Sequence, residues 1–151
     1  MTARFLAAGN IVFASLAGVN GLPERAERAL LDLQARGLTP TDFCFAMLIQ
    51  AYSHAGEWRL ALRVRRRLEL AGRPLTVHLY NAMISACHRH QQWDRALELF
   101  HEMRRSGIEP NGVTVRLMSS VGKIGEAEGR AGDRAWRSGA KQWQSRLQVS
   151  T

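Results

Sequence analysis

Residues 91–111, QQWDRALELFHEMRRSGIEPN, share much of their pattern with earlier segments of the same chain. Four kinds of position recur with a period of 35 residues: a glycine, an alanine, a tryptophan and a large apolar residue. They are Gly37, Gly72 and Gly107; Ala26, Ala61 and Ala96; Trp58 and Trp93; and Leu33, Leu68 and Met103. An internal repeat of this length indicates a stack of equal supersecondary units.

Each unit is predicted to form two helices. Apolar residues recur at helical spacing in 81–90 and in 94–105, namely Met83, Ile84 and Cys87, then Ala96, Leu97, Phe100 and Met103. Gly107 suits the left-handed turn that ends a helix, and Pro110 cannot continue it. Trp58 and Trp93 begin the second helix of their units and are expected to pack between repeats. Because stacked hairpins cover one another's apolar faces, the sequence predicts an all-α solenoid with one continuous concave surface.

The composition fits a single domain with an acidic partner. The chain has 151 residues, of which 46% are apolar and 23% charged, enough to bury a core. Its net charge of +8 and pI near 10.9 favour nucleic acid, an anionic lipid surface or an acidic protein as partner. Cys44 and Cys87 are too few for a disulfide scaffold and match no metal motif, so reduced thiols are expected.

The first residues allow two interpretations. Residues 5–23 carry no charge, but Asn10, Ser15, Asn20 and several glycines argue against a membrane-spanning helix. A targeting segment over residues 1–17, with Arg4 as its basic end, and an apolar core helix both remain open.

No catalytic or metal-binding motif is complete. HEMRR places Arg105 where a zinc-protease helix needs a second histidine, and GKIG places Ile124 after the lysine, where a phosphate loop needs Ser or Thr. Cys87, His88 and His90 of CHRH point in different directions on a helix, which argues against a metal site. We therefore expect neither an enzyme nor a metal or other cofactor.

The segment 77–111 resembles a pentatricopeptide repeat. The matching features are Tyr80-Asn81, Ala96-Leu97, the ridge from Phe100 to Met103, and the ending from Gly107 to Pro110. Residues 42–76 resemble a degraded copy, and 7–41 are recognisable mainly in their second half. Residues 1–6 then form a lead-in, and 112–151 a partial repeat followed by a basic capping helix with Trp136 and Trp143. Tetratricopeptide repeats are the close alternative, but Ile84 stands where they need a small residue.

This resemblance implies a right-handed α-α solenoid of about three stacked hairpins that binds single-stranded RNA in a mitochondrion or chloroplast. Each repeat would address one base through a residue of its first helix and through its last residue. The base-reading candidates are Asn81 with Asn111, Ala46 with Thr76, and Ile11 with Thr41. The base-stacking candidates are Phe43, His78 and Val113. Two amides resemble the family's pyrimidine-reading combination, whereas alanine cannot hydrogen-bond a base.

The arginine distribution supports an alternative. Arg59, Arg63, Arg66 and Arg67 lie on one side of a second helix, which in this family is on the convex side, whereas the first helices contain almost no Lys or Arg. The chain could instead be a structural or adaptor subunit of an organellar assembly, a ribosome or a membrane complex. It would then dock through its arginines on ribosomal RNA or on acidic protein subunits.

Overall fold

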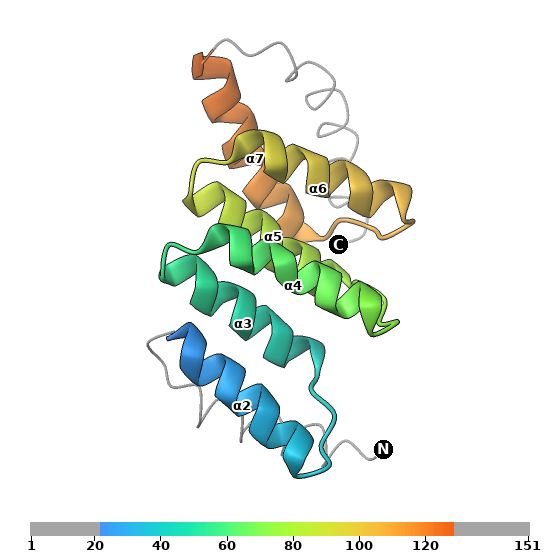
Figure 1. Cartoon of the computed structure of the whole chain (residues 1–151). Coiled ribbons are helices and arrows are strands. Elements are labelled where there is room, and N and C mark those ends of the chain that lie inside the picture. The colour runs from blue at the N-terminus through green and yellow to red at the C-terminus, as the bar shows by residue number, and fades with distance from the viewer. Residues whose placement is uncertain (1–21, 129–151) are drawn as a thin grey trace.

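The computed structural model describes residues 22–128, and their side chains as far as Val121. This part of the chain contains six helices and no strand, and the helices stack in chain order (Figure 1). They are α2 (Pro23–Ala35), α3 (Asp42–His54), α4 (Trp58–Leu70), α5 (Val77–Arg89), α6 (Trp93–Arg105) and α7 (Gly112–Glu128). The predicted lead-in, the possible targeting segment, Ile11, and the capping helix with Trp136 and Trp143 all lie outside the described residues.

The helix starts follow the repeat period. α3, α5 and α7 begin at Asp42, Val77 and Gly112, and α4 and α6 begin at Trp58 and Trp93. The hairpins α3–α4 and α5–α6 therefore have the predicted form, with 13 residues in each helix. α7 starts in register but continues for 17 residues, past the point where α3 and α5 end. α7 thus begins where the partial repeat was expected to begin, and it runs on through the position at which α3 and α5 give way to a turn.

Left-handed residues close the second helices at the predicted glycines. Their φ angles are 72° at Gly37, 67° at Gly72 and 76° at Gly107. After α6, the Gly107 N–H donates to the Arg104 carbonyl and the Ile108 N–H to the Met103 carbonyl, both at 3.0 Å. These two bonds satisfy carbonyls that the helix end leaves without a partner. The turn inside each hairpin uses a second left-handed residue, Gly56 in α3–α4 and Gln91 in α5–α6.

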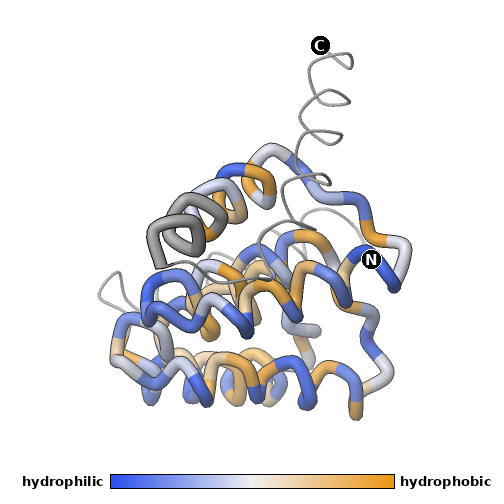
Figure 2. The backbone as a smooth tube through the Cα atoms, turned by 90° about the horizontal axis from the view of Figure 1, so that it is seen from above, coloured by the Kyte–Doolittle hydropathy of each residue, from blue (hydrophilic) through white to orange (hydrophobic). Residues whose placement is uncertain are grey.

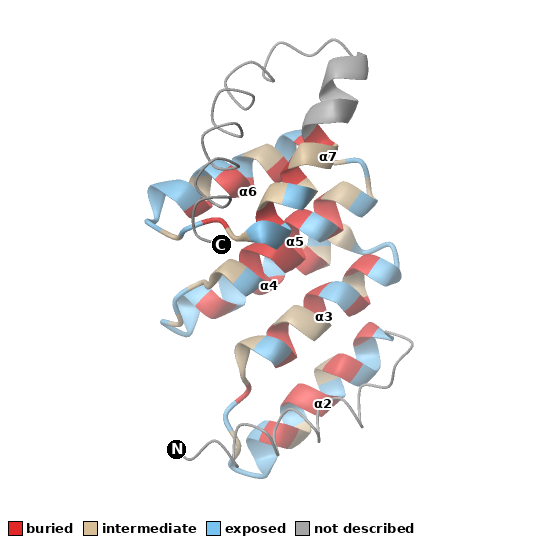
Figure 3. Ribbon diagram, turned by 180° about the vertical axis from the view of Figure 1, so that it is seen from behind, coloured by how far each residue is buried: buried red, intermediate tan, exposed pale blue. Residues whose placement is uncertain are grey.

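The helices form two layers. α3 contacts α5, and α5 contacts α7, so that these first helices form a continuous inner layer. α2, α4 and α6 form the outer layer, each packed against the inner helices next to it. Seen from above in Figure 2 and from behind in Figure 3, each helix is apolar and buried where it meets a neighbour and polar and exposed elsewhere. This amphipathic pattern is what allows hairpins of equal length to stack.

The repeated apolar positions form the core. Leu33, Leu68 and Met103 are at most 1% exposed. In α6, the structure corrects one prediction, since it buries Leu99 and leaves Leu97 only half-buried. The reason is helical geometry: Leu99 lies three residues after Ala96 and four before Met103, which places it on the same buried stripe.

The two tryptophans begin the outer helices as predicted. Trp93 is buried and meets the His88 ring edge to face, with 5.4 Å between the ring centroids. Trp58 is half-buried, and the Arg59 guanidinium lies 5.3 Å from the centroid of its ring. Both rings therefore serve packing at the hairpin turns.

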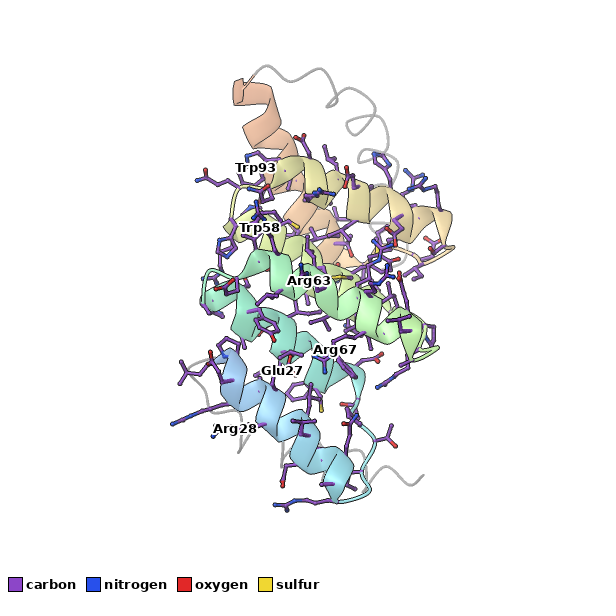
Figure 4. All side chains as sticks on the ribbon, viewed as in Figure 1. Glu27, Arg28, Trp58, Arg63, Arg67 and Trp93 are labelled. Atoms are coloured by element: carbon purple, nitrogen blue, oxygen red, sulfur yellow. The ribbon has the colours of Figure 1, made fainter. Side chains whose placement is uncertain are left out.

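Two polar clusters join the outer layer across repeats. In the Glu27 cluster (Glu27, Tyr52, Arg67), the Glu27 carboxylate accepts from the Tyr52 hydroxyl at 2.6 Å and from Arg67 at 2.7 Å. Figure 4 shows Glu27 and Arg67 facing each other between α2 and α4. Burial, followed by the hydrogen bond to Glu27, raises the pKa of Tyr52 to about 12.

The Glu102 cluster (Glu102, Arg65, Tyr80) contains the same three residue types, at other positions of the repeat, and lies between α4 and α6. The Glu102 carboxylate accepts from Arg65 at 2.6 Å and from the Tyr80 hydroxyl at 3.1 Å. α4 is thus tied to α2 by Arg67 and to α6 by Arg65. Long arginine side chains bridge outer helices whose backbones pack mainly against the inner layer. In the described residues, no helix combines the length and the apolar character needed to cross a membrane.

Candidate nucleic-acid interface

A groove of about 500 Å³ crosses the inner layer over α3, α5 and α7. Five of the residues singled out from the sequence line it: Phe43, Ala46, His78, Asn81 and Val113. They come from three consecutive repeats and converge because the 35-residue period places equivalent residues on the same face of successive first helices. The structure therefore brings most of the predicted site together in one surface.

Polar residues that sequence reasoning missed also line the groove. Gln50 on α3 and Ser85 on α5 are both exposed and lie 35 residues apart, in the register of the repeat. Either side chain can donate or accept a hydrogen bond. The sequence could have identified them, because each lies one helical turn after the base-reading candidate of its own helix.

The stacking candidates form a row at the start of the inner helices. Phe43, His78 and Val113 are each the second residue of their helix. Phe43 is 43% exposed and Val113 is 45% exposed, high values for large apolar side chains, and His78 is exposed as well. Phe43 and His78 offer ring faces on which a base can stack, and Val113 offers an aliphatic contact.

The two amide candidates are hydrogen-bonded to each other. Asn81, 7% exposed, donates from its amide nitrogen to the Asn111 amide oxygen at 3.0 Å. The Asn81 oxygen accepts from the hydroxyl of Thr114 at 2.6 Å. Asn111, the last residue of this repeat, is thus bonded directly to the first helix of the repeat, and both are bonded to Thr114 in the first turn of α7.

Thr114 and Asn111 also cap α7. Asn111 directly precedes the helix, its side-chain oxygen accepts from the Thr114 N–H at 3.1 Å, and its own N–H donates to the Thr114 hydroxyl at 3.2 Å. This is a reciprocal cap that satisfies two backbone donors. Thr114 was not predicted as part of the site, although an Asn followed three residues later by Thr at a helix start is a capping pattern.

The hairpin α3–α4 supplies much less. Ala46 lies in the groove but has no polar group, and Thr76 does not line it. The Thr76 hydroxyl oxygen is buried and has no hydrogen-bond partner among the described residues. The base-reading candidates of this hairpin, Ala46 and Thr76, therefore differ from the amide pair in chemistry and in setting.

The groove carries little charge. None of its lining residues is Lys or Arg. Its one carboxylate, Asp42, lies 3.4 Å from Arg73, which also donates to the Pro40 carbonyl at 2.6 Å. The chemistry of the groove is therefore suited to contacts with base faces and edges and poorly suited to contacts with phosphate.

The arginines of α4 divide into two groups. Arg59, Arg63 and Arg66 are exposed and make no ion pair with any described residue. Arg67, expected in the same basic surface, is half exposed, but its charge is compensated by Glu27, and Arg65 is compensated by Glu69 and Glu102. Arg28 on α2, at the position equivalent to Arg63, is also exposed (Figure 4).

A model of the PPR repeat matches residues 43–72, and a model of the PPR repeat family matches residues 75–120, which together make up half of the chain. The chain belongs to the pentatricopeptide repeat family. Two chloroplastic pentatricopeptide repeat-containing proteins of Arabidopsis thaliana are 27% and 28% identical over 103 and 112 residues, or 67% and 73% of this chain. The chain spans only 20% and 23% of their lengths.

Solved structures of the family show the same fold. The pentatricopeptide repeat protein PPR10 in complex with an 18-nt psaJ RNA element is 24% identical, with a TM-score of 0.64 over 86% of this chain and 18% of that one. PPR10 from maize is 20% identical, with a TM-score of 0.58 over 97% of this chain and 24% of that one. At this identity the likeness concerns the fold, and the chain spans less than a quarter of the matched protein.

Proposed function

We propose that this pentatricopeptide repeat chain binds single-stranded RNA in a mitochondrion or chloroplast, where it acts in RNA processing, stability or translation. The observation that carries the proposal is the Asn81–Asn111 amide pair beside a groove lined by Phe43, His78 and Val113. The RNA bound to PPR10 and the chloroplastic relatives support the same ligand and the same type of compartment.

In this proposal each group has a separate role. A base lies between the side chains of successive inner helices, against His78 and Val113, while the Asn81–Asn111 pair hydrogen-bonds its edge. The preceding base lies against Phe43 and His78 and meets Ala46, which can contribute contact but no hydrogen bond. The hairpin α5–α6 therefore supplies sequence preference, and α3–α4 supplies mainly contact area.

The magnitudes predict weak binding by the groove alone. Each engaged base contributes about 1–3 kcal/mol, whereas micromolar affinity requires about 8 kcal/mol. One well-equipped repeat and its neighbours fall below that value. Phosphate contacts by arginine would have to add the remainder, and these contacts weaken as salt concentration rises.

A competition experiment tests the base preference. Labelled single-stranded RNA is bound to the chain at low salt and displaced with cytidine, uridine, adenosine or guanosine homopolymers of equal length. We expect pyrimidine polymers to compete best and Asn81→Ala to remove this preference. Gln34→Ala is the matched control, because it removes an exposed amide on α2 that does not line the groove. Equal competition by all four polymers would contradict the proposal.

The exposed arginines favour a second candidate function, that of an adaptor in an organellar assembly. Arg28, Arg59, Arg63 and Arg66 form a basic outer surface on α2 and α4, away from the groove, and they suit ribosomal RNA phosphate. The double variant Arg63→Glu and Arg66→Glu leaves both polar clusters intact. If it abolishes all RNA binding while Asn81→Ala changes nothing, the adaptor function is favoured over base recognition.

A further inference from the structure

The capping bonds of α7 determine which way the Asn111 amide faces. Because the backbone N–H of Thr114 is a donor, the atom of Asn111 that lies 3.1 Å from it must be the oxygen. That oxygen also accepts from Asn81 at 3.0 Å and lies 3.1 Å from the Thr114 hydroxyl. The Asn111 amide nitrogen consequently points away from these groups.

The orientation of Asn81 follows from the same bonds. Its nitrogen donates to the Asn111 oxygen, so its own oxygen lies on the other side of the amide and accepts from the Thr114 hydroxyl at 2.6 Å. This hydroxyl in turn accepts from the Asn111 N–H at 3.2 Å. Thr114 is fully buried, so no solvent molecule replaces its hydroxyl in these contacts.

The two amides are therefore left with unequal hydrogen-bonding capacity. Both oxygens are already engaged by donors of the protein, whereas the second N–H of Asn81 and both side-chain N–H groups of Asn111 have no acceptor among the described residues. We infer that Thr114 is a specificity-determining positioning residue, which engages the amide oxygens so that the Asn81–Asn111 pair presents mainly N–H donors to a bound base. This inference rests on the proposed function.

A surface that offers mainly donors discriminates among bases. Uracil and cytosine present a carbonyl oxygen at position 2, and cytosine adds an acceptor nitrogen beside it. Adenine presents one acceptor ring nitrogen on this edge, but beside it stands an exocyclic amino group, which is a donor and would meet another donor. Because a polar group that is desolvated without a partner costs free energy, the arrangement favours pyrimidines over adenine.

The other repeat junctions lack this device. The positions equivalent to Thr114 are Leu79 on α5 and Cys44 on α3, and both are fully buried. Leucine has no donor, and the Cys44 sulfur lies 3.5 Å from the Thr41 hydroxyl, a contact of a weakly polar group. Among these three equivalent positions in the described part of the chain, the hydroxyl of Thr114 thus occurs at the junction that has the amide pair.

The test separates the hydroxyl from the shape of the side chain. Thr114→Val keeps the branched shape and removes the donor, whereas Thr114→Ser keeps the hydroxyl. Binding of single-stranded RNA probes of cytidine, uridine or adenosine is compared with that of the unmodified chain. We expect Thr114→Val to reduce the ratio of pyrimidine to adenosine affinity by about fivefold, the equivalent of one hydrogen bond. Thr114→Ser should restore most of the ratio.

A second measurement does not depend on RNA. The side-chain N–H signals of Asn81 and Asn111, followed by NMR, report how fast each proton exchanges with water. We expect one Asn81 proton to be protected in the unmodified chain and in Thr114→Ser, and to lose that protection in Thr114→Val. Thermal unfolding of each variant shows whether the fold is retained.

The possible outcomes distinguish this inference from the function on which it rests. An unchanged pyrimidine ratio in a folded Thr114→Val variant would overturn the role of Thr114 and leave RNA binding intact. A native chain that binds all probes equally would overturn the proposed base recognition and the inference with it. A lower ratio with lost Asn81 protection, both restored by serine, supports the inference.

Discussion

The hairpins α3–α4 and α5–α6 differ in the groove far more than in the core. Leu68 and Met103 are buried at equivalent positions, and all four helices have the same length. In the groove, however, α3–α4 presents Ala46 where α5–α6 presents the Asn81–Asn111 pair. The comparison shows that the residues that determine stacking are separate from those that give the groove its chemistry. The groove can therefore change its chemistry without loss of the solenoid.

The largest effect is expected from the shared core. Leu68→Ala and Met103→Ala each remove a fully buried side chain, so each should lower the free energy of unfolding by about 2–5 kcal/mol. Urea denaturation measures this. Leu70→Ala, on the same helix as Leu68 but 77% exposed, should leave stability nearly unchanged. A large cost in one hairpin and a negligible cost in the other would contradict their structural equivalence.

A transfer of the amide pair sharpens the comparison. Ala46→Asn with Thr76→Asn gives the hairpin α3–α4 the two amides of α5–α6. If the groove recognises one base per repeat, the variant gains a contact worth about 1–3 kcal/mol, or at least about fivefold in RNA affinity. Titration with a pyrimidine RNA measures the gain.

The control for this transfer has the same size without the polar groups. Ala46→Leu with Thr76→Leu adds similar volume and no hydrogen bond. If it raises affinity as much as the asparagine pair does, contact area accounts for the effect and base-edge recognition does not. Unchanged affinity of both variants would show that this hairpin does not meet the RNA.

The comparison also explains what could be predicted from the sequence. The 35-residue period, seen for example in Gly72 and Gly107, was sufficient to predict the helices, their turns and the two hairpins. Each repeated residue type has the same structural role in every repeat. The row from Phe43 to Val113 followed from the resemblance and the same register. Local signals were thus sufficient for the helices and turns of each repeat, although they did not identify Leu99 in place of Leu97 as the buried residue of α6.

Contacts between repeats were not predictable in this way. Arg67 meets Glu27, which lies 40 residues earlier, and this separation is not the period of the repeat. Thr114 acts on Asn81 across 33 residues and belongs to the next repeat, so its role appears only when the helices are stacked. The extension of α7 was missed because its glycines suggested an irregular segment.

The polar clusters give a smaller effect that again compares the two hairpins. Glu27→Gln and Glu102→Gln should each lower the free energy of unfolding by about 1 kcal/mol or less, since the charged partners are partly exposed. Glu102→Gln should cost more, because Glu102 is 24% exposed and Glu27 is 30% exposed. Chemical denaturation at low salt measures both losses of stability. A larger loss for Glu27→Gln than for Glu102→Gln would contradict the expectation that the less exposed carboxylate contributes more.

A matched control and a pH profile support this measurement. Glu98→Gln removes an exposed pair with Arg95 inside α6 and should have no measurable effect.

The pKa of Tyr52 is raised from 10.0 to about 12, so folding favours its protonated form. That contribution is fully present below about pH 10 and is lost as the pH rises toward 12. Tyr52→Phe should reduce this alkaline loss of stability.

The smallest effect concerns the turns inside the hairpins. Gly56 has φ +83°, and Gln91 has φ +58° at the equivalent position. A left-handed conformation costs a residue with a side chain about 1 kcal/mol, whereas glycine adopts it freely but is more flexible when unfolded. Gly56→Gln should therefore destabilise the chain by about 1 kcal/mol, and Gln91→Gly should stabilise it by a few tenths of a kcal/mol. Thermal unfolding of the two variants measures both changes in stability. Because Gln91 is exposed, a destabilising Gln91→Gly would mean that its side chain contributes to the turn in a way that Gly56 cannot.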